Sequence, residues 1–177
     1  AYDCRKKDEE NAKEEIMLNG PEMGKDQSYF ALAGGRVSPN NNLIVYGVDL
    51  VSRREYTLHF KNLSSGEVLT DEIEKTTGSA VWANDNKTVF YAKQDVETLR
   101  SYKIFKHVIG SKASDDVEIY HEKDETFGTF VYKTKSKKYL VIGSYSTLST
   151  EYQILNADNP TGDFTIFQPR ERELEYS

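Results

Sequence analysis

Serine and histidine are the residues of this chain with the greatest capacity for catalysis, because together they form the catalytic centre of many hydrolases. In one large group of these enzymes the nucleophile lies in a G-x-S-x-G turn, which exposes the serine beside its oxyanion donors. Gly78-Ser79 is followed by Ala-Val-Trp, and Gly143-Ser144 is followed by Tyr-Ser-Thr. Neither stretch fits the pattern, so both serines are predicted to lie in strands or turns.

The three histidines, His59, His107 and His121, therefore have no serine nucleophile to activate. His59 and His107 fall at corresponding late positions in two copies of a repeat, which indicates a packing role. Joint metal binding is disfavoured because the two copies belong to neighbouring units. The oxygen-rich pairs Asp115-Asp116 and Asp158-Asn159 lack the ligand spacing of a calcium loop. We predict no catalytic residue, no metal and no cofactor in this chain.

Three arginines are candidates for contacts with a peptide or with another domain. Arg53 and Arg54 lie in a charged bend, and Arg100 lies in the corresponding bend of the next repeat. Guanidinium groups suit carboxylates and backbone carbonyls. Simple surface charge is the alternative interpretation, and the pattern alone favours it.

The densest basic segment is Lys133–Lys138, with the sequence KTKSKK. It falls between two predicted strands and has no interleaved aromatic residues. We therefore predict a solvated hairpin turn rather than a binding patch.

Composition limits the class of partner. The 177 residues carry 23 Lys+Arg against 29 Asp+Glu, a formal net charge of −6. No basic stripe alternates with aromatic side chains, which argues against nucleic acid. No apolar run approaches the roughly 18 residues that span a membrane, and no secretory signal opens the chain. Cys4 is the single cysteine, so no intrachain disulfide is expected. We expect a soluble, cytoplasmic chain.

The elements that would carry these residues repeat along the chain. Tyr56, Tyr102 and Tyr152 follow one another at about 46 and 50 residues, and each opens the predicted third strand of a unit. A strand-rich period of this length is typical of β-propeller blades. Each blade must cover its apolar faces with neighbours, which explains continuously apolar runs such as Leu43–Tyr46. The sequence predicts an all-β fold of four-stranded antiparallel blades.

Three complete blades are predicted, at residues 28–75, 76–123 and 124–170. Residues 1–27 would be the remnant of an earlier blade, and residues 171–177 the start of the innermost strand of a further one. Propellers close with about four to eight blades. We therefore predict a single partial β-propeller domain over residues 1–177, not a closed ring.

The predicted remnant contains one local conflict. Tyr2–Lys6 is predicted to be a strand, whereas Glu9–Leu18 is rich in helix formers but has no apolar stripe beyond its last three residues. We favour a strand over Glu15–Leu18, because tertiary context commonly overrides weak helix propensity.

The segment Thr76–Asp95, TTGSAVWANDNKTVFYAKQD, resembles the propeller domain of the oligopeptidase B (protease II) group in the prolyl oligopeptidase family of serine peptidases. The resemblance covers nearly the whole chain, and the departures at residues 19–27, 111–115 and 128–138 lie mostly in loops. The other matching stretches are Tyr2, 4–6, 28–32, 37–39, Arg54, 56–58, 97–100 and 175–177.

This resemblance implies a longer parent protein. In that family an α/β-hydrolase domain carries a Ser-Asp-His triad, and a seven-bladed propeller covers it and admits only short peptides. Oligopeptidase B-like members cleave after Lys or Arg. We therefore expect this chain to be a non-catalytic propeller fragment that gates substrate access to a hydrolase domain absent from it.

Two other interpretations stay open. A propeller could serve only as a protein-interaction scaffold, although the recurrent Gly-His and Trp-Asp pairs of WD repeats are absent. An autonomous small enzyme would turn over a Lys/Arg-linked chromogenic peptide, which we do not expect. Because a cut ring exposes apolar sheet faces, we also predict self-association.

Overall fold

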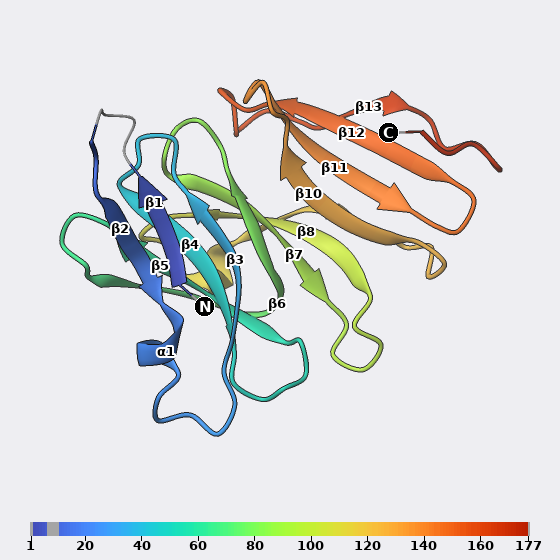
Figure 1. The fold of residues 1–177 in the computed structure, drawn as a ribbon. Helices are drawn as coiled ribbons and strands as arrows, with labels where there is room; N and C mark the ends of the chain where they lie inside the picture. Colours follow the sequence, from blue (N-terminus) through green and yellow to red (C-terminus); the bar gives the residue numbers. More distant parts are fainter. Residues whose placement is uncertain (1, 7–10, 177) are drawn as a thin grey trace.

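The computed structural model describes residues 2–6 and 11–176, and these are mainly β-strands (Figure 1). They form antiparallel sheets of two, seven and four strands, in which neighbours in sequence are neighbours in space. This up-and-down order confirms the predicted all-β, partial propeller architecture. The elements are β1 Tyr2–Lys6, β2 Glu14–Asn19, α1 Gly20–Met23, β3 Ala31–Val37, β4 Leu43–Asp49, β5 Tyr56–Asn62, β6 Val68–Trp82, β7 Thr88–Gln94, β8 Ser101–Val108, η1 Ala113–Asp115, β9 Val117–His121, β10 Gly128–Lys133, β11 Tyr139–Tyr145, β12 Thr150–Asn156 and β13 Thr165–Gln168.

The long strand β6 joins two blades into the seven-stranded sheet. Its first half pairs with β5 and its second half pairs with β7. Lys75 and Gly78, between the two halves, have positive φ angles of 60° and 82°. We call β3, β4, β5 and the first half of β6 the first blade. The second half of β6 with β7, β8 and β9 is the second blade, and β10–β13 is the third blade.

One of the predicted boundaries between blades falls inside a strand, and the others fall between strands. The boundary between residues 75 and 76 falls within β6, so no connection marks it. The boundaries after residues 27, 123 and 170 lie between strands. The division at these residues stays a prediction.

Both ends of the described chain add detail to the sequence-based expectations. The strand favoured over Glu15–Leu18 is confirmed as part of β2, whereas residues 7–10 lie outside the described part. The short helix α1 follows directly, because Asn19 caps it and Pro21 suits a first turn. Residues 171–176 form no strand. Instead the Tyr176 hydroxyl donates to a backbone carbonyl of β13, and its ring packs on β12.

The hydrophobic core lies in layers between the sheets. Phe60 and Trp82 are buried between the first and second blades, and Phe90 and Leu140 between the second and third. Leu18 of the β1–β2 hairpin covers the outer side of the first blade. Most residues of β4, β7 and β11 are buried, which agrees with the long apolar runs in these strands.

The backbones of β3 and β6 approach closely at Gly34 and Gly78. Both residues have positive φ angles, of 68° and 82°. A Cβ atom on Gly34 would overlap the carbonyl oxygen of Gly78. Only glycine therefore allows the first strands of two neighbouring blades to come this near.

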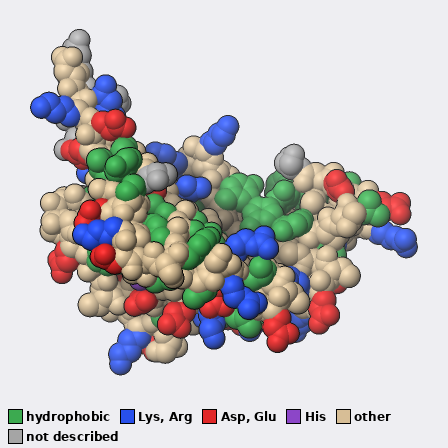
Figure 2. Space-filling view, turned by 60° about the horizontal axis from the view of Figure 1, so that its bottom comes forward, with side chains coloured by type: hydrophobic (Ala, Val, Ile, Leu, Met, Phe, Trp, Pro, Cys, Tyr) green, Lys and Arg blue, Asp and Glu red, His purple; other side chains and the backbone are tan. Residues whose placement is uncertain are grey.

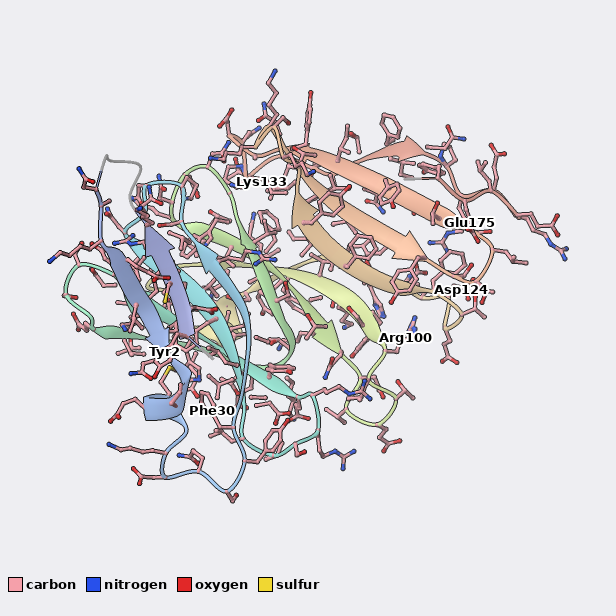
Figure 3. All side chains as sticks on the ribbon, viewed as in Figure 1. Tyr2, Phe30, Arg100, Asp124, Lys133 and Glu175 are labelled. Atoms are coloured by element: carbon pink, nitrogen blue, oxygen red, sulfur yellow. The ribbon has the colours of Figure 1, made fainter. Side chains whose placement is uncertain are left out.

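Connections between strands gather at two ends of the molecule. We call one the Arg100 end; it carries the connections that follow β4, β7, β9 and β11. The other, the Lys133 end, carries the turns that follow β3, β6 and β10. Figure 3 labels Arg100 and Lys133, which lie at opposite ends of the sheets. Within the described residues no helix has the length and apolarity to cross a membrane.

Candidate docking and channel surfaces

The first strands of the three blades form a concave wall. These strands are β3, the second half of β6 and β10, and β6 lies between the other two (Figure 1). In a propeller this position faces the central channel. A groove of about 480 Å³ lies on this wall toward the Lys133 end. In Figure 2 the surface is hollowed between the β1–β2 hairpin, at the upper left, and the third blade, at the right.

The Arg100 end exposes apolar side chains at corresponding places in three blades. Leu50 and Val51 follow β4, Val96 follows β7 and Leu148 follows β11, and their exposed fractions lie between 41% and 61%. Figure 2 turns this end toward the viewer and shows hydrophobic side chains among charged ones. Repeated apolar exposure on one face is typical of an interaction surface.

Two of the arginines singled out in the sequence lie at this end with exposed side chains. Arg53 and Arg54 form no side-chain hydrogen bond or ion pair within residues 2–6 and 11–176. Their backbone is held, because the Arg54 amide donates to Asp49 at 2.8 Å and Gln94 Nε2 donates to the Arg54 carbonyl at 2.6 Å. The bend is therefore fixed while both guanidinium groups stay available to a partner.

Arg100 has a different role. Its Nε donates to the carbonyl of Phe127 at 2.8 Å, and its Nη2 donates to those of Glu122 and Asp124 at 2.8 and 2.9 Å. Arg100 was a candidate for contact with a peptide or another domain, but the carbonyls that it binds belong to the β9–β10 connection of its own chain. Figure 3 shows Arg100 beside Asp124. Arg100 ties the second blade to the start of the third.

His107 lies fully buried in a charged network between the first two blades. Its Nδ1 is 2.7 Å from Asp116 Oδ1, and its Nε2 is 3.0 Å from Asp71 Oδ1. Asp71 belongs to the first-blade half of β6, whereas Asp116 precedes β9. The Tyr91 hydroxyl donates to the second oxygen of Asp116 at 2.7 Å, and the Gly110 amide donates to Asp71 at 2.6 Å. The network therefore links two blades.

Burial by itself would lower the pKa of His107. The hydrogen bonds and negative charges of Asp116 and Asp71 outweigh burial and raise this pKa above its ordinary value. Burial, aided by the bond to Asp116, also raises the pKa of Tyr91. Both ring nitrogens of His107 face a carboxylate oxygen, which favours the protonated ring and is a structural arrangement rather than a nucleophile–base pair. No local sequence pattern predicts the contact between His107 and Asp71, because the two residues are 36 positions apart in sequence.

The other two histidines lie on separate strands in unrelated surroundings. His59 stacks on Tyr46 with ring centroids 5.7 Å apart, and burial lowers its pKa. His121 packs edge-on against Tyr102 and lies 3.7 Å from Glu118. The three histidines do not converge. Among the described residues no group of three or more His, Cys, Asp or Glu side chains is placed to hold a metal.

The candidate serines are also separated from the histidines. Ser79 is exposed on the channel wall, whereas the buried Ser144 donates to the Tyr120 hydroxyl at 3.1 Å. Within the described part of the chain neither serine bonds to a histidine.

A second charged network links the second and third blades at the Arg100 end. The carboxylate of Glu122, which is 3% exposed, accepts from Arg170 at 2.6 Å and from Tyr120 at 2.7 Å. The Arg170 guanidinium lies 3.7 Å from the centre of the Phe127 ring. Burial would raise the pKa of Glu122, but the bonds from Arg170 and Tyr120 lower it below its ordinary value. Burial raises the pKa of the Tyr120 phenol to about 12, together with the hydrogen bond that it donates to Glu122.

Up-and-down antiparallel blades around a concave wall define part of a β-propeller. The chain belongs to the prolyl oligopeptidase family, because the family model described as the N-terminal beta-propeller domain of prolyl oligopeptidase matches residues 2–177.

Individual relatives agree with this membership. The chain is 37% identical over 165 residues to dipeptidyl aminopeptidase BI of Pseudoxanthomonas mexicana, covering 93% of this chain and 23% of the relative. It is 27% identical to protease 2 of Moraxella lacunata, covering 94% and 24%. Among solved structures, oligopeptidase B from Leishmania major superposes with a TM-score of 0.89 at 30% identity, covering 98% and 25%. The chain therefore spans about a quarter of the length of these relatives.

Proposed function

We propose that this chain is a non-catalytic part of the propeller of a serine peptidase, and that the propeller limits which substrates reach a hydrolase domain. The family membership and the peptidase names of the relatives support this proposal. The described residues contribute channel wall and docking surface, and their serines and histidines lie apart.

The observation that carries the proposal is the repeated apolar exposure of Leu50, Val51, Val96 and Leu148 at the Arg100 end. Every blade begins and ends at this end, because β3 and β10 start there and four-stranded up-and-down blades return to the same side. A chain that enters and leaves such blades does so on that side, so a flanking domain of the same chain would be attached there. The hydrolase domain would thus rest on these side chains, with Arg53 and Arg54 beside them.

The substrates are short peptides in this proposal, and two cleavage modes compete. Resemblance to oligopeptidase B favours cleavage after Lys or Arg. The higher identity to a protein named dipeptidyl aminopeptidase favours release of dipeptides from the N-terminus. Blocked and unblocked chromogenic peptides with Lys or Arg at the cleavage site distinguish the two, because only an endopeptidase tolerates a blocked N-terminus.

The test uses the complete reading frame that contains this chain. Leu50→Glu with Val51→Glu places two charges on the docking face and should raise cleavage of an unfolded protein relative to a short peptide, because the gate loosens. Val68→Glu is the matched control, since Val68 is 51% exposed on β6 away from this end. An unchanged ratio in the double variant would contradict the gating role.

A different observation would favour the alternative that the propeller is a protein-interaction scaffold. A reading frame that closes the ring and stops, without a G-x-S-x-G serine downstream, would favour a propeller used only for protein interaction. Turnover by the purified 177-residue chain, abolished by a serine-directed inhibitor, would instead overturn the non-catalytic assignment.

A further inference from the structure

Four cationic side chains line the groove on the channel wall. Arg36 comes from β3, Lys133 ends β10, and Lys135 and Lys137 lie in the turn that follows. None of the four forms an ion pair within the described ranges 2–6 and 11–176. The whole chain carries a formal net charge of −6, so a cluster of four cations without ion-pair partners in those ranges has a local charge opposite in sign to that of the chain.

Arg36 and Lys133, the two cations on strands, donate hydrogen bonds only to uncharged acceptors. Arg36 Nη1 donates to the carbonyl of the adjacent Gly35 at 3.1 Å. Lys133 Nζ donates to the amide oxygen of Asn84 at 2.9 Å. Both acceptors are neutral, so these hydrogen bonds are not ion pairs and leave the remaining donors of each cation available.

Acidic groups near this site lie outside the lining. Asp158 accepts from Asn84 Nδ2 at 2.7 Å, and Asp158 and Asp85 raise the pKa of Lys133. Burial and the neighbouring Lys137 outweigh them and lower this pKa. An anion entering the groove would therefore relieve repulsion between lysines rather than displace an existing partner.

The groove also has apolar walls. Val37 and Pro39 line one side, and Tyr132 lines the other, with Trp82 between them. Trp82 Nε1 donates to the Arg36 carbonyl at 2.9 Å, which fixes the distance between β3 and β6. A volume of about 480 Å³ accommodates a few residues of extended chain.

We propose that this groove binds an acidic peptide segment in extended conformation. Its carboxylates would meet Arg36, Lys133, Lys135 and Lys137, while its apolar side chains would pack on Tyr132 and Pro39. Charge complementarity selects the acidic side chains, and the apolar walls select a peptide over a bare anion. The proposal needs only the channel wall and is independent of any hydrolase domain. It departs from the sequence interpretation of Lys133–Lys138 as a solvated turn, because β3 supplies Arg36 and β6 supplies the floor.

The experiment measures fluorescence anisotropy of a fluorescein-labelled peptide of eight residues that alternates Glu and Val, titrated with this chain. Lys135→Gln with Lys137→Gln should weaken binding about fivefold, which corresponds to about 1 kcal/mol for two exposed charge pairs that contribute about 0.2–1 kcal/mol each. Lys138→Gln is the matched control: Lys138 is exposed in the same turn but does not line the groove, so its loss should change Kd less than about twofold. Arg36→Gln should weaken binding as well, from the opposite wall.

Four results would overturn the proposal. Equal weakening by Lys138→Gln would mean diffuse attraction to the turn, and equal binding of a Lys-Val peptide would remove the charge selectivity. Inorganic phosphate that displaces the peptide at the peptide's own concentration would assign the site to small anions. Absence of binding at low ionic strength would overturn it outright, because electrostatic attraction is strongest there.

Discussion

The two junctions between blades are built differently. At the first junction, between the first and second blades, the backbone continues through β6, Gly34 meets Gly78, and His107 is fully buried between two carboxylates. At the second junction the sheets are separate and side chains make the link. Arg170, the cation of that second network, keeps 26% of its side chain exposed.

This difference predicts unequal sensitivity to substitution. A buried charge that loses its partner has no water to replace it, whereas a half-exposed one is partly solvated. Close backbone packing likewise leaves no room for relaxation. The first junction should therefore tolerate less change than the second.

The largest effect is expected for His107→Gln. The variant leaves Asp71 and Asp116 buried without their cation, and the free energy of unfolding should fall by about 3–5 kcal/mol. Urea denaturation of this chain measures it. His121→Gln is the control, because 36% of the His121 side chain is exposed and the change should alter stability by less than about 0.5 kcal/mol. Similar losses in both variants would refute a special role for the first junction.

The same residue predicts a pH dependence. Since the folded-state pKa of His107 is raised, its contribution is fully present below about pH 6.5 and is lost as the pH rises through the folded-state pKa. The stability difference between wild type and His107→Gln should therefore shrink from about pH 6 to about pH 9. Denaturation curves at both pH values test this, and a constant difference would contradict the ionic role.

The second largest loss of stability is expected where Gly34 contacts Gly78. Gly34→Ala adds a methyl group that overlaps the Gly78 carbonyl, in a backbone with φ of 68°. Gly66→Ala is a matched control, because Gly66 has φ of 78° but no atom within 4 Å of the added methyl. The control should cost about 1 kcal/mol from backbone strain alone, and Gly34→Ala about 2 kcal/mol more. Equal losses would show that the close approach is unimportant.

The second junction should give a smaller loss. Glu122→Gln removes the charge that faces Arg170, and stability should fall by about 1–3 kcal/mol. Glu125→Gln, an exposed change in the same connection, should have little effect. Thermal unfolding compares the two, and a loss larger than that of His107→Gln would reverse the ranking of the junctions.

The smallest effect on stability is expected on the outer face of the third blade, which no other blade within residues 2–6 and 11–176 covers. Phe130, Tyr145 and Tyr152 pack together there, and Tyr145 is 51% exposed. We expect this face to mediate self-association of the chain, which Tyr145→Ser should weaken while Val68→Ser should not. Light scattering at high concentration tests this, and a strictly monomeric wild-type chain would contradict it.

The blade pattern could be predicted because it depends on residues that are close together in the sequence. Period-two alternation, apolar second strands and Asn- or Gly-rich turns act within a few residues, so the sequence predicts strands at 43–49, 88–92 and 139–143. The structure confirms all three and extends the last two to residues 94 and 145. The resemblance within 76–95 likewise pointed to the family that the comparison confirmed.

The candidate sites could be predicted only in part. Arg53, Arg54 and Arg100 were placed in corresponding bends, but their sequence positions do not show that Arg100 binds its own chain while the other two stay exposed. The expected strand near residue 174 does not form, because Tyr176 finds hydrogen bonds on β12 and β13 instead.

The sequence by itself determined the repeated strands, their turns and the lack of a nucleophile elbow, since these depend on neighbouring residues. Only the tertiary structure decided that Asp71 meets His107, that Gly34 meets Gly78, and that Arg36 joins the lysines after β10. Such contacts join residues from different blades, and the curvature of the sheets selects them. A one-dimensional pattern carries no information about which blade surfaces face each other at atomic distance.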